Sequence, residues 1–188
     1  MISDFILGIF AFYFFFQNRN ISKNWSLFFV FMSIAAFIGS AFHGNPVIGQ
    51  QFRFLSWSVL SASLIFAQLA TYERLKSFSL NMLFVVKSVL FLSFAIHYSE
   101  FMYMVTDIAI SLLGFVVIGD LWVFKSPSKK ITYGILISIS SALIVTLKLD
   151  IHSEYLTAND LGHYISIISL MYISKGVGET VMEVKELA

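Results

Sequence analysis

Seven long apolar stretches, separated by short polar segments, dominate this sequence and limit what it can fold into. Most of them approach the roughly 20 residues that an α-helix needs to cross the hydrocarbon core of a bilayer. They are continuously apolar, which favours helices over the alternating strands of a membrane barrel. With 58% hydrophobic and 12% charged residues, a soluble domain of this size could not bury them. The stretches cover Ile2–Phe16, Trp25–Phe42, Phe54–Ala70, Phe78–Ile96, Met102–Phe124, Ile131–Leu147 and Ala158–Ile173.

The predicted fold is therefore an all-α membrane protein, a bundle of seven transmembrane helices in a single domain over residues 1–188. The first and last stretches are short, so six spans is the alternative count. The spans and their connections use up the whole chain, and no internal repeat divides it.

Basic residues predict the orientation of the bundle. Of the 12 Lys and Arg residues, nine fall in the odd-numbered loops or the C-terminal segment, and Arg53 and Lys148 fall on the other side. The remaining one, Lys87, lies inside the fourth span. Because basic loops stay in the cytoplasm, we expect the N-terminus outside and the C-terminus inside. The compact chain favours the inner membrane of a bacterium as its location.

Histidines are expected to cluster at the outer ends of the spans. His43 ends the second span, His97 ends the fourth, His152 lies in the sixth loop and His163 lies near the start of the seventh span. Ionisable groups at membrane depth are costly, so a one-sided set of them predicts a functional polar site.

Helical spacing links polar residues to two of these histidines. Ser40 precedes His43 by three residues, and Asn159 and Asp160 precede His163 by four and three, so each set shares one helical face. Zinc accepts imidazole nitrogen and carboxylate oxygen.

These faces predict a zinc site with His43 and His163 as ligands, completed by Asp160, His152 or Asn159. An alternative explains the same residues by local structure. In that interpretation His43 sits at a solvated helix end, Thr157 or Asn159 caps the seventh helix, and Asp160 complements the helix dipole.

Asp107 and Lys87 lie inside apolar spans. Asp107 could accept a hydrogen bond from a histidine ligand or orient a metal-bound water, or it could pair with Lys87. An aspartyl dyad of Asp107 with Asp120 is excluded, because thirteen residues of helix separate them by about 20 Å. Asp120 is expected to pair with Lys125 or the basic fifth loop.

The Ser-x-x-His that ends the second span and the polar-x-x-x-His that opens the seventh resemble motifs of the CREST superfamily. That group includes alkaline ceramidases, progestin and adiponectin receptors, and hemolysin III proteins. The resemblance implies a seven-helix bundle with zinc on three histidines, a serine and an aspartate beside the zinc-bound water, and hydrolysis of ceramide-like amides.

Carried over by position, the resemblance assigns His43 and His163 as zinc ligands. Asn159 stands where the family has its other histidine, Gly39 stands at the usual serine position with Ser40 beside it, and the third span has no aspartate.

The resulting functional prediction is a zinc-dependent intramembrane hydrolase of a lipid amide or ester. Its candidate catalytic residues are Asp107 or Asp160 as general base, and Ser40. The main alternative is a non-catalytic receptor-like or accessory protein that binds a lipid or small molecule in the same pocket. A smaller alternative is haem held by His43 with His97 or His163. Membrane lipids are the expected partners, and the absence of a basic stripe argues against nucleic acid.

Overall fold

A computed structural model describes the backbone of residues 2–44, 49–75, 77–119, 121, 128–152 and 156–186, and the side chains of these residues except 44, 74 and 180–186. Nearly all of the described residues are helical, which confirms the all-α prediction. The helices are α1 (Ile2–Asn18), α2 (Lys23–Gly44), α3 (Gly49–Tyr72), η1 (Glu73–Leu75), α4 (Phe78–Tyr98), α5 (Met102–Ile108), η2 (Ala109–Ile118), α7 (Lys129–Thr146) and α8 (Ala158–Glu186).

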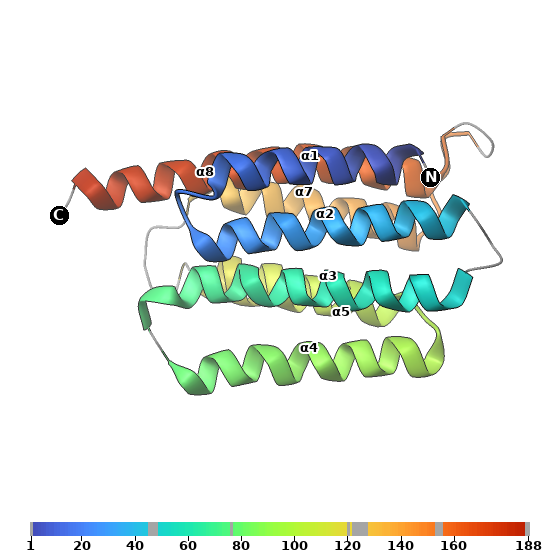
Figure 1. The fold of residues 1–188 in the computed structure, drawn as a ribbon, viewed down its shortest axis with the longest axis horizontal. Helices are drawn as coiled ribbons and strands as arrows, with labels where there is room; N and C mark the ends of the chain where they lie inside the picture. Colours follow the sequence, from blue (N-terminus) through green and yellow to red (C-terminus); the bar gives the residue numbers. More distant parts are fainter. Residues whose placement is uncertain are drawn as a thin grey trace.

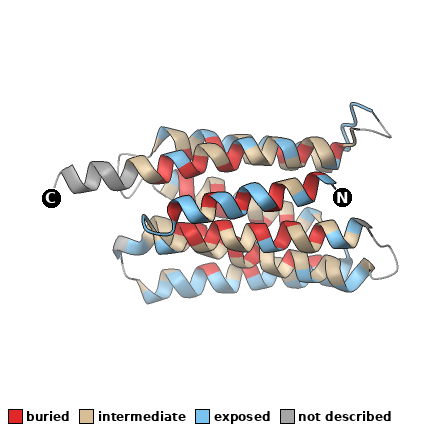
Figure 2. Ribbon diagram, turned by 45° about the horizontal axis from the view of Figure 1, so that its top comes forward, coloured by how far each residue is buried: buried red, intermediate tan, exposed pale blue. Residues whose placement is uncertain are grey.

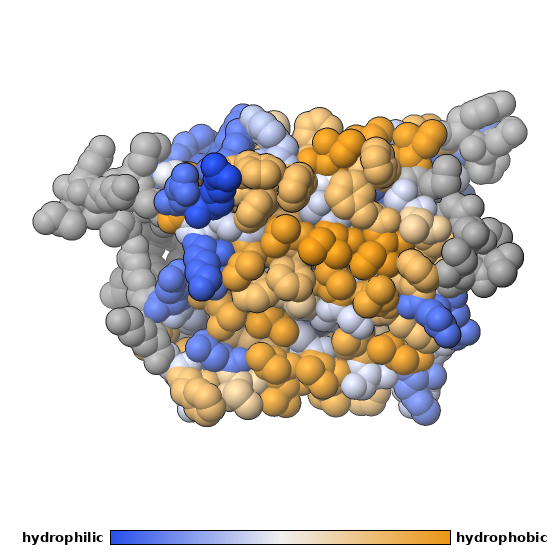
Figure 3. All heavy atoms as spheres, in the orientation of Figure 1, coloured by the Kyte–Doolittle hydropathy of each residue, from blue (hydrophilic) through white to orange (hydrophobic). Residues whose placement is uncertain are grey.

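Four of these helices, α2, α3, α4 and α7, are long and apolar enough to cross a membrane. Helix α1 and the continuous rod formed by α5 and η2 are apolar but shorter. Figure 3 shows apolar side chains over the middle of the visible face, with hydrophilic side chains gathered toward its two ends. A chain with this surface has the character of a membrane protein.

The helices lie side by side and form a ring. Packing contacts join α1 to α2, α2 to α3, α3 to the α5–η2 rod, that rod to α7, and α7 to α8, which returns to α1 (Figure 1). Helix α4 stays outside the ring, and its main packing contacts are with α3 and α5. Short connections make consecutive helices antiparallel, so even-numbered connections fall at one end of the ring.

Apolar side chains fill the interior of the ring (Figure 2). Helix α4 contributes none of the buried residues of this core. A smaller cluster of Trp57, Ala95 and Met104 packs the C-terminal half of α4 against α3 and α5. Helices α7 and α8 approach closely at glycines. A Cβ atom at Gly134 would lie 2.8 Å from the Ser169 carbonyl oxygen, and one at Gly176 would lie 2.7 Å from the Ile131 nitrogen. Small residues thus permit this backbone contact, as is common between membrane helices.

Several helices extend beyond the apolar stretches that predicted them. Arg53 and the pair Lys129 and Lys130 lie in helices rather than in loops, and α8 continues past Lys175 to Glu186. The guanidinium of Arg53 lies 5.2 and 5.1 Å from the ring centres of Phe54 and Trp57, so a cation–π contact accommodates it there. Counting apolar residues misses such turns, because helices continue with polar residues into the membrane interface.

Residues 109–118 depart from the expected α-helix in a different way, because they form the π-helix η2. π-helical segments are rare in proteins, and those that occur are often found at functional sites. Asp120 and Lys125, whose pairing was predicted, lie outside the described residues.

Candidate functional site

All four histidines belong to one end of the bundle, here called the outer end. His43 and His97 lie in the last turns of α2 and α4, His152 lies between α7 and α8, and His163 lies in the second turn of α8. Figure 1 shows these helix ends on the same side of the bundle. His43 and His163 are close enough for their charges to interact. His97 is exposed on the peripheral helix α4 and packs against Tyr98.

His163 belongs to a polar group that we call the outer cluster, made of Ser3, Asp4, Asp160 and His163. The hydroxyl of Ser3 lies 2.6 Å from Asp160 Oδ1 and 3.0 Å from His163 Nδ1. On the other side of the imidazole, Nε2 lies 3.2 Å from Asp4 Oδ1. The outer cluster is therefore a linear chain of contacts that joins the first turn of α1 to α8.

The start of α8 holds Asp160 in place. Thr157 accepts a hydrogen bond from the Asp160 backbone N–H at 3.3 Å, and its own hydroxyl donates to Asp160 Oδ2 at 2.7 Å. The Thr157 N–H also donates to Asp160 Oδ2 at 3.3 Å, which completes a reciprocal capping box. Of the alternative interpretation, these bonds match the cap by Thr157, and Asp160, expected to complement the helix dipole, lies in the first turn of α8.

The α1 half of the outer cluster is sealed from solvent, whereas Asp160 and His163 on α8 are only partly buried. Ser3 and Asp4 are buried, whereas 22% of the His163 side chain is exposed. A buried glycine of α2 makes room for Asp4, because a Cβ atom at Gly39 would lie 3.3 Å from Asp4 Oδ1. Gly39 is the position at which the CREST resemblance expects a serine, so a carboxylate from α1 approaches that position here.

Sequence reasoning did not select Ser3 and Asp4. The available signal was a carboxylate in the first turn of an otherwise apolar span, which costs free energy unless it has a partner. Its partner lies 159 positions away in the sequence, and nothing in the local pattern indicates which helix supplies it.

The other predicted site residues surround the outer cluster or lie apart from it. Ser40 is half-buried on α2, while His43, His152 and Asn159 are exposed. No group of three His, Cys, Asp or Glu side chains within the described part of the chain is arranged to hold a metal ion. Both ring nitrogens of His163 also face protein atoms, so the described side chains do not fit a zinc site, and zinc stays a prediction.

Asp107 lies in a second polar group, here called the midplane cluster, with Lys87, Ser88 and Ser111. The ammonium of Lys87 forms an ion pair with Asp107 Oδ1 and donates to Ser111 at 2.7 Å and to Ser88 at 3.1 Å. The Ser111 hydroxyl lies 3.2 Å from the same carboxylate oxygen. Asp107 thus contacts residues of α4 and η2 and no histidine among the described residues. This arrangement fits the predicted alternative in which Asp107 pairs with Lys87.

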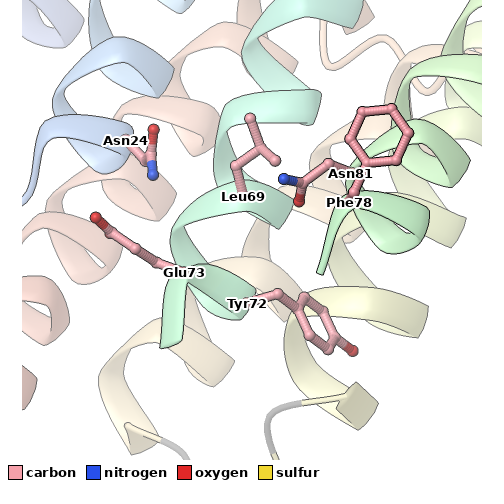
Figure 4. A pocket seen from close by; sticks show the side chains of 6 residues that line it. All are labelled: Asn24, Leu69, Tyr72, Glu73, Phe78 and Asn81. Atoms are coloured by element: carbon pink, nitrogen blue, oxygen red, sulfur yellow. The ribbon is translucent and has the colours of Figure 1, made fainter. Parts of the chain in front are cut away.

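A cavity of about 460 Å³ opens at the opposite end of the bundle, between the ends of α2, α3 and α4. Figure 4 shows the amides of Asn24 and Asn81 on its two sides, with Glu73 below and Leu69 between them. A second, smaller hollow of about 190 Å³ lies beside Lys129 and Tyr133 at the start of α7. Neither cavity is lined by a histidine.

Comparison with known proteins gives one match. No curated protein and no solved structure shows significant similarity to the chain. The model of a protein family described as "Family of unknown function (DUF6962)" matches residues 1–181, which is nearly the whole sequence. The chain therefore belongs to the DUF6962 family.

Proposed function

We propose that this protein is a non-catalytic membrane protein of the receptor-like or accessory kind, and that the ligand of its outer cluster is a proton. The observation that supports the proposal is a count of hydrogen atoms. Three contacts join Asp160, Ser3, His163 and Asp4 in a row, at 2.6, 3.0 and 3.2 Å. The first two are hydrogen bonds, each of which needs one hydrogen atom, and the His163–Asp4 contact is an ion pair only when the imidazole carries a hydrogen on Nε2.

The groups themselves supply two hydrogens when both carboxylates are ionised and the imidazole is neutral, one from the Ser3 hydroxyl and one from the His163 ring. This total is independent of which ring nitrogen carries the hydrogen. The outer cluster is therefore complete only when it binds one additional proton. The exposed part of the His163 ring gives that proton a route from solvent.

Loss of this proton has a mechanical consequence. At one of the three contacts two acceptors then face each other, and the contact between α1 and α8 weakens. Under this proposal the folded outer cluster binds a proton that the unfolded chain releases, so the contribution of that proton to stability is present at lower pH and is lost as pH rises. A proton in solution would in this way control the packing of the first helix on the last.

Distance measurement between two spin labels tests the proposal directly. The chain has no cysteine, so labels can be attached at Phe5→Cys and Tyr164→Cys, both exposed positions near the outer cluster. We expect the distance between labels to broaden and lengthen between about pH 5 and about pH 9, the range in which a histidine site exchanges its proton.

The matched variant is Asp4→Asn, in which the amide supplies the missing hydrogen to His163 Nε2. The label distance should then be the same throughout the pH range. A wild-type distance that does not change with pH, or an Asp4→Asn protein that responds like the wild type, would contradict the proposal.

Hydrolysis of a lipid ester or amide is the second candidate, because Ser3, His163 and Asp4 also have the order of a nucleophile, a base and an orienting carboxylate. It ranks second because Ser3 is buried and its hydroxyl lies closer to Asp160 than to His163. A fluorophosphonate probe should label wild-type protein but not Ser3→Ala if this function operates. Absence of labelling in folded wild-type protein would exclude serine-based hydrolysis.

We further propose seven spans, with the outer end facing outside and the C-terminus in the cytoplasm. The charge distribution supports this orientation, because Arg53 and Lys148 are the basic residues assigned to the outer end and the opposite end carries most of the others. Single cysteines at Glu100→Cys and Lys175→Cys should react with a membrane-impermeant maleimide from outside and inside, respectively. The reverse pattern would overturn the orientation.

A further inference from the structure

The cavity at the end opposite the outer cluster, here called the inner-end cavity, brings polar and apolar side chains together. Its volume of about 460 Å³ lies within the roughly 300–1,000 Å³ of small-molecule sites. Figure 4 shows the amides of Asn24 and Asn81 on either side of Leu69, with the Glu73 carboxylate on the side of Asn24. The lining residues are Asn24, Leu69, Tyr72, Glu73, Phe78 and Asn81. Residues from α2, α3, η1 and α4 thus converge on one space.

Three of the lining side chains have unused hydrogen-bonding groups. Asn24, Glu73 and Asn81 form no side-chain hydrogen bond or ion pair with any described residue. Tyr72 differs, because its hydroxyl donates to the Phe115 carbonyl at 3.1 Å. A ligand in the cavity would therefore meet two carboxamides, which both donate and accept hydrogen bonds, and one carboxylate, which accepts them.

This lining favours a ligand with a primary ammonium group. Glu73 is the charged residue of the lining, and a carboxylate attracts an ammonium and repels an anion. A primary ammonium has three N–H donors, which Glu73 and the amide oxygens of the two asparagines can accept. A quaternary ammonium is bound instead by a cage of aromatic rings. Of the two lining rings, Tyr72 packs on Phe84 at 5.4 Å between ring centres and Phe78 is 76% exposed, so these two rings form no cage.

An apolar face of α3 leads from the cavity toward the middle of the bundle. Helices α2 and α4 both pack against α3 but have no substantial contact with each other among the described residues, so this face lies open between them. The open face carries Leu69 and, four, seven and eleven residues earlier, Ile65, Ala62 and Ser58, all of them half-buried. The Ser58 hydroxyl donates to the Phe54 carbonyl at 2.8 Å and so needs no other acceptor. These residues extend over about 16 Å of helix, close to half of the roughly 30 Å hydrocarbon core, which is the depth that one acyl chain spans.

We propose that the inner-end cavity binds the headgroup of a phospholipid with a primary ammonium group, and that one acyl chain lies on the open face of α3. In this arrangement Glu73 accepts hydrogen bonds from the ammonium, and the amides of Asn24 and Asn81 donate to the phosphate. The cavity lies between helix ends, at the depth of lipid headgroups, whereas a soluble amine would leave the open face uncovered. The site is separate from the outer cluster, so this proposal does not depend on the proposed function.

Native mass spectrometry of the protein with added lipids tests the proposal. Dioleoyl phosphatidylethanolamine, phosphatidylcholine and phosphatidylglycerol share their acyl chains and differ in the headgroup. We expect wild-type protein to bind phosphatidylethanolamine about tenfold more tightly than the other two, the effect of one hydrogen bond to a charged group. Glu73→Gln should remove most of this preference. Glu100→Gln, the same change at an exposed position of the outer end, is the matched control and should keep it.

The same titrations define the results that would overturn the proposal. These are equal binding of the three lipids by wild type, tighter binding of phosphatidylcholine or phosphatidylglycerol, or a Glu73→Gln protein that keeps the preference. Soluble glycerophosphoethanolamine distinguishes a lipid from a free amine. It should compete at least about tenfold less well than the lipid, because each buried CH₂ of an acyl chain contributes to binding. Equal competition would reject a lipid as the ligand.

Photo-crosslinking locates the bound acyl chain without relying on a charge variant. A phosphatidylethanolamine with a diazirine in its acyl chain should give adducts on α3 between Ser58 and Leu69 and on the flanking helices α2 and α4. Leu69→Trp, which fills the start of the open face, should reduce these adducts. Adducts spread evenly over the apolar surface, or unchanged in Leu69→Trp, would show only the lipids that surround any membrane protein and would contradict the proposal.

Discussion

Replacing Lys87 by methionine removes the cation that compensates a fully buried carboxylate. Only 10% of the Lys87 side chain and none of the Asp107 side chain is exposed, so solvent cannot take over this role. Breaking a buried ion pair at one partner typically costs about 3–5 kcal/mol. We take about 3 kcal/mol, because polar groups of an unfolded chain in a membrane also find partners. The folding equilibrium constant should then fall roughly 150-fold.

Reversible unfolding in mixed detergent micelles, followed by far-ultraviolet circular dichroism, measures this change. The double variant Lys87→Met with Asp107→Asn contains no buried charge and should recover to within about 1 kcal/mol of wild type. Lys175→Met, at an exposed position on α8, is the control and should have no effect. A Lys87→Met protein as stable as wild type, or a double variant no better than the single one, would refute the reasoning.

Three further substitutions probe other parts of the fold. Thr157→Ala removes the cap of α8 and should lower the free energy of unfolding by about 1 kcal/mol, whereas Thr157→Ser should retain it in the same micelle assay. Gly134→Val places side-chain atoms against the α8 backbone and should lower the thermal midpoint, while Gly178→Ala, where nothing lies within 4 Å, should not. Arg53→Gln loses cation–π contacts worth about 1 kcal/mol, and Arg53→Lys should lose less; equal loss in both would point to another role.

The helices could be predicted from sequence because their signal is local. Wherever the structure describes it, each apolar stretch coincides with one helix or, for Met102–Phe124, with the α5–η2 rod. The differences lie at helix ends: Leu147 follows the end of α7, α3 begins before Arg53, and α8 continues past Lys175. The π-helix was missed because η2 is as uniformly apolar as an α-helix, and its period leaves no trace in the pattern.

The polar clusters were predictable only in part, because a contact between helices is not encoded in spacing along one of them. Asp107 and Lys87 stood out as charged residues inside apolar spans, and because such residues are few, each had few possible partners. His163 and Asp160 stood out in the same way, but the choice among Ser3, Asp4, His43 and His152 as neighbours depends on how α1, α2 and α8 pack. Residue types predicted a zinc site, which stays a prediction, and the packing surrounds His163 with Ser3 and Asp4.

The outer cluster joins residues that the ribosome synthesises at the start of the chain to residues that it synthesises near the end. Ser3 and Asp160 are 157 positions apart, so the first helix enters the membrane long before its partner exists. During that interval Asp4 lacks its imidazole partner, and a nascent chain that stalls before α8 keeps it so. Completion of the last helix would supply the imidazole and distinguish a finished protein from a truncated one for the proteases that survey membrane proteins.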